Sequence, residues 1–128
     1  MKRLVPVLGL LALAFVLVAC SGSNAAPSGP AKSADPNALQ ISSKDLKFST
    51  DKLVAPAGKP FQIAYDNQEA APHNVAIYTD QSAATKIFVE DPFGGPQQVV
   101  YDVPAIAAGS YFFRCDVHPD MKGTLEVK

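Results

Sequence analysis

The feature that most constrains the fold is an alternation of apolar and polar side chains in short runs from residue 37 onward. In the clearest run, residues 61–65, Phe61, Ile63 and Tyr65 share one face, and the run stops at Asp66-Asn67. Period-2 patterns of this kind predict strands with one buried face, and Gly, Pro, Asn and Asp separate the runs. The best candidate for a helical turn is residues 80–85, and no longer helical period occurs.

Short strands at this spacing predict an all-β domain: a two-sheet, antiparallel Greek-key β-sandwich of about eight strands. The segments expected to be strands are residues 39–41, 46–48, 52–55, 61–65, 73–78, 87–90, 98–103, 110–115 and 123–128. Residues 93–96 (Phe-Gly-Gly-Pro) are expected to be an ordinary connection, with a place near the functional site as the alternative. The domain predicted from this pattern is residues 37–128.

The N-terminus has the pattern of an export signal. A basic start, Lys2-Arg3, precedes an apolar run from Leu4 to Val18. That run of about 15 residues is shorter than the ~20 that a membrane-spanning helix needs, and it fits the central region of a secretory signal. Residues 1–19 are therefore expected to be a signal peptide.

The end of this run, Leu17-Val18-Ala19-Cys20, resembles the bacterial lipobox, whose cysteine is acylated and becomes the mature N-terminus. The resemblance implies lipidation at Cys20 and an exported protein held at the extracytoplasmic face of the cell membrane. The alternative is an ordinary signal cut near Ala19, which would leave Cys20 as a free or disulfide-bonded thiol. Residues 20–36 are then the lipidated cysteine and a flexible tether, because the stretch is small, polar and proline-rich.

The charge balance argues against nucleic acid as a partner. The chain has 11 Lys and Arg against 12 Asp and Glu, and no basic stripe that would neutralise a phosphate backbone. We expect a monomer whose contacts are with the membrane, through the lipid, and with other proteins.

The potential metal ligands of the domain lie at two places. His73 stands alone, and Cys115, His118 and Met121 fall within seven residues. A thiolate, two imidazoles and a weak axial thioether form the donor set that supports copper in both oxidation states, whereas structural zinc prefers more thiolates or a closed set without thioether. The sequence predicts one copper ion, Cu(II) or Cu(I), held by these four residues.

These motifs resemble those of the cupredoxins, the small blue type 1 copper proteins. The Cys-x-x-His-x-x-Met spacing follows an aromatic strand, Tyr111 to Cys115, and Pro72-His73-Asn74-Val75 lies upstream. The spacing, with a proline after His118, is similar to the short loop of amicyanins rather than the longer one of plastocyanins. The resemblance implies that Asn74 ties the two ligand segments together by hydrogen bonds. Asp116, where many relatives have a hydroxyl residue, is the departure that can alter this tie or the potential.

The resemblance also implies a function. We expect a one-electron carrier with transient redox-protein partners, not an enzyme, and no catalytic residue. By the same resemblance His118 is the electron port, within an apolar patch to which Ala70, Ala71, Pro72 and Pro119 contribute. The alternative is an extracytoplasmic copper carrier or chaperone with the same ligands, which would deliver or buffer copper. A Cys–His nucleophile is disfavoured, because no third group orients the histidine.

Overall fold

The structure, a computed structural model, describes residues 32–128. The expected signal peptide, Cys20 and most of the expected tether lie outside the described residues. Within residues 32–128 the chain forms nine strands, and none of it forms a helix of the length and hydrophobicity that would span a membrane. The turn at residues 80–85 is not helical, because Asp80 instead accepts the backbone N–H of Ser82 in a tight turn.

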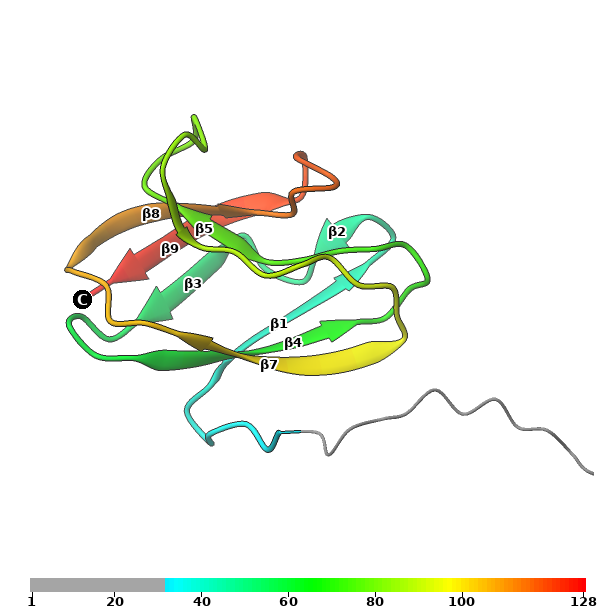
Figure 1. The fold of residues 1–128 in the computed structure, drawn as a ribbon, viewed down its shortest axis with the longest axis horizontal. Helices are drawn as coiled ribbons and strands as arrows, with labels where there is room; N and C mark the ends of the chain where they lie inside the picture. The colour runs from blue at the N-terminus through cyan, green and yellow to red at the C-terminus, as the bar shows by residue number, and fades with distance from the viewer. Residues whose placement is uncertain (1–31) are drawn as a thin grey trace, which may run out of the picture.

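Two sheets pack face to face (Figure 1). The first has the order β2-β1-β4-β7, formed by β2 (Lys47–Phe48), β1 (Leu39–Lys44), β4 (Phe61–Asn67) and β7 (Gln97–Val103). The second has the order β3-β9-β8-β5-β6, formed by β3 (Lys52–Ala55), β9 (Lys122–Val127), β8 (Gly109–Arg114), β5 (Ala76–Tyr78) and β6 (Lys86–Phe88). The predicted all-β, two-sheet sandwich is confirmed.

Each sheet contains one parallel pair in an otherwise antiparallel arrangement. β1 pairs with β4 in parallel, and β3 pairs with β9 in parallel. The chain leaves the first sheet after β2, forms β3 in the second sheet, and returns to form β4 beside β1 in the same direction. The sheets are thus antiparallel, as expected, except for these two pairs, which were not predicted because alternation determines which face of a strand is buried but not its direction.

The core lies between the sheets and follows the alternation of the sequence. Every second residue of β4, beginning at Phe61, is buried, and the residues between them are half-buried. Ile63, Phe113 and Leu125 are fully enclosed. Phe113 lies on β8 two residues before Cys115, so the packing of the core fixes the strand that leads into the ligand loop.

Two segments near the site differ from what the sequence predicted. The strand expected at residues 73–78 is confined to Ala76–Tyr78, and His73 instead forms an isolated bridge with Phe93. Phe93 N–H donates to His73 O, and His73 N–H donates to Phe93 O, both at 3.1 Å. The Phe93–Pro96 segment is therefore more than an ordinary connection, because its first residue holds the backbone of His73 by two hydrogen bonds.

Candidate metal centre

The three residues of the Cys-x-x-His-x-x-Met motif lie on one tight loop between β8 and β9. Cys115 follows the last residue of β8, and the pairing of Arg114 with Lys122 sets the width of the loop. Cys115 N–H donates to Met121 O at 2.8 Å, and Met121 N–H donates to His118 O at 2.9 Å. These bonds close the loop on itself, so the two-residue gaps place the side chains of the motif at one end of the sandwich.

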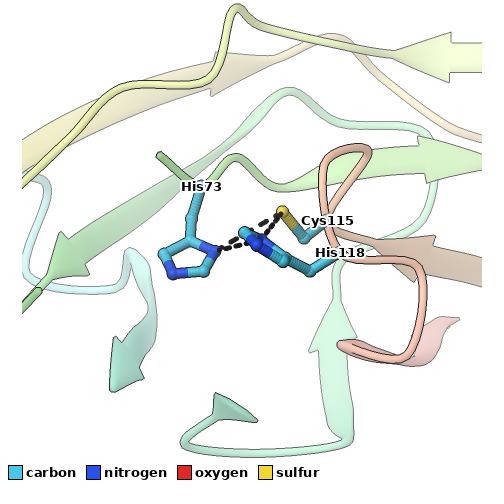
Figure 2. A group of neighbouring side chains, drawn as sticks. All are labelled: His73, Cys115 and His118. Carbon is cyan, nitrogen blue, oxygen red and sulfur yellow. Dashed lines mark hydrogen bonds between the residues drawn. The ribbon is translucent and has the colours of Figure 1, made fainter. Parts of the chain in front are cut away.

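The structure brings His73 to the same point from the other side of the sequence (Figure 2). The Cys115 Sγ atom lies 3.6 Å from His73 Nδ1 and 3.9 Å from His118 Nδ1, and the two Nδ1 atoms are 3.1 Å apart. Donor atoms that bind one metal ion at bond lengths of about 2.0–2.3 Å lie at distances from one another comparable to these three. Among residues 32–128 this is the one group of three or more histidine, cysteine and acidic residues whose donor atoms converge in this way.

The predicted ligands differ in how exposed they are to solvent. His73 and Cys115 are 0% exposed, and Met121 is 3% exposed. His118 is only half-buried, and its neighbours Val117 and Pro119 are exposed. A buried thiol and imidazole with a buried thioether on the same loop form a soft, dry donor set, and this chemistry fits one copper ion better than a structural zinc ion.

The orientation of the His73 ring is set by Glu69, a residue that sequence reasoning missed. Glu69 Oε1 lies 2.7 Å from His73 Nε2. A carboxylate at this distance accepts the Nε2–H proton, which leaves Nδ1 as the nitrogen that faces Cys115 and His118. A carboxylate four residues before the histidine was the only signal in the sequence, and it did not show that the chain bends at residues 69–71.

Glu69 is itself held by a second segment. Its carboxylate accepts the backbone N–H groups of Asp45 at 3.1 Å and Leu46 at 3.0 Å, in the turn between β1 and β2. The hydrogen bond from Leu46 is the largest influence on its pKa, and with the contact to His73 it holds the pKa of Glu69 below the usual value. A carboxylate that stays ionised is the form that accepts the His73 proton.

Asn74 connects the two ligand segments. Its Oδ1 accepts the backbone N–H of Asp116 at 2.8 Å, and its Nδ2 donates to Glu90 O at 2.8 Å. The bond to residue 116 uses the backbone, so the replacement of a hydroxyl side chain by Asp116 leaves this link in place. The Asn74 side chain is fully buried.

The Asp116 carboxylate points to a different set of partners. It accepts hydrogen bonds from Tyr78 Oη at 2.6 Å and from Arg114 Nε at 3.0 Å. Burial opposes ionisation of Asp116, but the bonds from Tyr78 and Arg114 outweigh burial and lower its pKa. The charge next to the Cys115 thiol is therefore compensated by Arg114 on the same strand end.

Comparison with known proteins matches nearly all of the described chain. The family model for a cupredoxin-like domain matches residues 9–127. Amicyanin-alpha of Methylorubrum extorquens is 31% identical over 121 residues, which cover 92% of this chain and 98% of that protein. The crystal structure of amicyanin from Paracoccus versutus has a TM-score of 0.57 at 26% identity, over 73% of this chain and 84% of that one.

A solved structure at lower identity supports the fold. Auracyanin A of the green thermophilic photosynthetic bacterium Chloroflexus aurantiacus, described as a "blue" copper protein, has a TM-score of 0.62 at 23% identity. The alignment covers 71% of this chain and 98% of auracyanin A. The alignment thus spans nearly all of that protein, and the shared part is the sandwich that carries the site.

Proposed function

The chain belongs to the cupredoxin-like family, and from this premise we propose that it holds one copper ion and carries single electrons between redox proteins. The observation that carries the proposal is the convergence of one thiol and two imidazole Nδ1 atoms, all within 4.8 Å of one another, at the end of a rigid sandwich. When bound, copper supplies one-electron chemistry between Cu(II) and Cu(I). Relatives bearing the names amicyanin and auracyanin, one of them called a blue copper protein, are consistent with this function.

The proposed ligands are His73, Cys115 and His118, with Met121 as the weak axial ligand. Each strong ligand is held by a bond that does not involve the metal: Glu69 holds the ring of His73, and backbone bonds within the loop hold Cys115 and His118. A site that is braced in this way changes little when the charge of the metal changes, which favours fast electron transfer. No bound substrate is transformed in this scheme, and we expect no enzymatic activity.

His118 is the proposed electron port. It is the half-buried member of an otherwise enclosed set, and Val117 beside it is 44% exposed. Ala70, Pro72 and Pro119 are also exposed, and they can surround the ring with apolar surface. A small apolar surface of this kind suits a weak and transient partner.

The test of the port is His118→Gly in the copper-loaded full chain in detergent. The variant should lose normal electron exchange, measured by NMR line broadening in mixtures of the oxidised and reduced protein. Added imidazole should restore exchange, because it can occupy the vacated donor position. Unchanged exchange in the variant without imidazole would refute the assignment of His118.

Copper delivery is the competing function, and the burial of the site argues against it. His73 and Cys115 are both 0% exposed and are held by hydrogen bonds, so an acceptor protein can reach the metal only past His118. Reversible voltammetry together with slow loss of copper to a chelator would support electron transfer. Rapid transfer of copper to a copper-free oxidase would favour delivery instead.

The proposed location is the extracytoplasmic face of the cell membrane, with the lipid on Cys20 as anchor. The basis is the lipobox-like segment and the signal pattern that precedes it. Mass spectrometry of the protein extracted from the membrane fraction should find a mature N-terminus at Cys20 that carries acyl chains. An unmodified Cys20 would contradict the anchor without touching the copper proposal.

A further inference from the structure

Asn67, the last residue of β4, is fully buried and bonded to four partners in different parts of the chain. Its Nδ2 group donates to Ala71 O at 2.9 Å and to Phe93 O at 2.8 Å. Its Oδ1 atom accepts Ser43 Oγ–H at 3.1 Å and Glu69 N–H at 3.2 Å. An asparagine amide has two donor hydrogens and two acceptor lone pairs, so this side chain is saturated.

Two of the four partners, Phe93 and Glu69, bind His73 directly, and a third, Ala71, lies close to it in the chain. Phe93 exchanges two backbone hydrogen bonds with His73, and Ala71 lies two residues before it in the chain. Glu69 binds the Nε2 side of the His73 ring. No hydrogen bond joins Asn67 to His73, yet Phe93, which pairs with the His73 backbone, and Glu69, which binds the His73 ring, are both bonded to the amide of Asn67.

The backbone partners make the amide orientation unambiguous, because the carbonyls of Ala71 and Phe93 can only accept a hydrogen bond and Glu69 N–H can only donate one. Ser43 has one hydroxyl proton, and it donates this proton to Asn67 Oδ1, so the hydroxyl of Tyr65, 2.8 Å away, must donate to Ser43 Oγ. Tyr65 can do so only while protonated, and burial raises its pKa to about 12. The buried chain from Tyr65 through Ser43 to Asn67 therefore runs in one direction, and Nδ2 must face the carbonyls of Ala71 and Phe93.

The backbone around Asn67 is as closely packed as its side chain. A Cβ atom added at Gly95 would overlap Asn67 O, and Gly95 N–H donates to Glu69 O at 2.8 Å. The 93–96 segment therefore lies directly on the end of β4. A change in the Asn67 side chain cannot be absorbed by a shift of this segment without moving Phe93, and with it His73.

We propose that Asn67 is a positioning residue that holds His73 in place for the metal, without itself forming a hydrogen bond to this ligand. This inference rests on the proposed copper function. Groups beyond the ligands that orient a ligand histidine typically change metal affinity by about 10–100-fold when they are removed. Loss of the Asn67 amide should fall in this range, through displacement of His73 rather than loss of a donor.

The sharpest variant is Asn67→Asp in the copper-loaded full chain. It keeps the shape and the acceptor for Ser43 and Glu69, but turns an acceptor oxygen toward the carbonyls of Ala71 and Phe93. We expect copper to dissociate to a chelator at least about tenfold faster, with an altered visible and EPR spectrum of the Cu(II) form. Ser43→Ala, which removes one of the four contacts, should produce a smaller change in the same direction and serves if Asn67→Asp does not fold.

The control is Val103→Ala, a core truncation at the far end of the same strand pair. Val103 is 1% exposed and pairs with Phe61, whereas Asn67 pairs with Gln97 at the other end of β4. The two positions are six residues apart along β4, roughly 20 Å at the rise of a strand. Val103→Ala should lower stability but leave the copper spectrum and the dissociation rate unchanged.

The outcomes separate this inference from the proposed function. A wild-type chain without a blue Cu(II) spectrum would overturn the function and the inference together. A blue wild-type chain whose residue-67 and residue-43 variants lose only stability, as Val103→Ala does, would overturn the positioning role alone. Faster copper loss and a changed spectrum in those variants, but not in Val103→Ala, would support it.

Discussion

Replacing Asn74 by alanine tests whether the two ligand segments are held together before any metal binds. The side chain is 0% exposed and makes one hydrogen bond to Asp116 N–H and one to Glu90 O, each at 2.8 Å. In Asn74→Ala, both backbone groups lose this partner. A buried polar group left unpaired costs about 1–3 kcal/mol.

Glu90 is an exposed residue, so water can partly replace the bond to its carbonyl, whereas Asp116 N–H is half-buried and has less access to water. We therefore expect Asn74→Ala to lower the free energy of unfolding by about 2–4 kcal/mol, with most of the loss at Asp116. The measurement is urea unfolding of the copper-free full chain in detergent, followed by far-UV circular dichroism. Copper must be absent, because a ligand that binds only the folded state would add its own stabilisation.

The matched control is Gln40→Ala, which deletes a side-chain amide whose one bond, to Ala38 O at 3.1 Å, is made at an exposed residue. This variant should lose no more than about 0.5–1 kcal/mol. If Asn74→Ala costs no more than Gln40→Ala, Asn74 does not link the ligand segments in the copper-free protein. In the copper-bound form, the reduction potential of Asn74→Ala should also differ from that of the wild type, since the amide next to Cys115 is freed.

Three further predictions concern the axial ligand, the packing and the core. Met121→Leu should keep copper and raise the reduction potential in voltammetry, because an axial electron-pair donor that helps to stabilise the higher charge of Cu(II) is replaced by hydrocarbon; loss of all copper would contradict the axial role. Gly123→Ala should lower the free energy of unfolding by about 1–3 kcal/mol in the same urea titration, because its new Cβ would overlap the Phe113 ring. The control is Gly109→Ala, whose Cβ would meet the Tyr111 ring at 3.4 Å. This variant should be nearly neutral. Burial raises the pKa of Tyr65 to about 12, above the ordinary value of 10. The stability from this shift is fully present below pH 10 and is lost as the pH rises toward 12. The titration of Tyr65 can be isolated by subtracting the phenolate absorbance of Tyr65→Phe from that of the wild type. If this difference titrates near pH 10 in the folded protein, the prediction is refuted.

The strands could be predicted because their cause is local. The alternation in residues 61–65 is the burial pattern of β4, and the aromatic run before Cys115 is the core strand β8. Strand direction could not be predicted in this way. The parallel pairs β1–β4 and β3–β9 depend on the chain crossing between sheets, which no run of side chains records.

The site could be predicted only where its spacing is local. Cys115 and His118 converge, with Met121 buried on the same loop, because the chain turns tightly after β8, and a seven-residue motif contains that information. Glu69 and Asn67 could not be found, because their partners come from the β1–β2 turn and from the segment around Phe93. Those contacts depend on the tertiary arrangement of segments that lie far apart in the sequence.

The most direct test of the central claim is the visible and EPR spectrum of the full chain after loading with Cu(II), with Cys115→Ser as control. A copper ion bound by the Cys115 thiolate and the two imidazoles should produce an intense blue absorption band and the narrow copper hyperfine splitting of a type 1 site. Both signals should vanish in Cys115→Ser. A colourless wild-type protein, or one whose spectrum is the same with and without Cys115, would contradict the proposed centre.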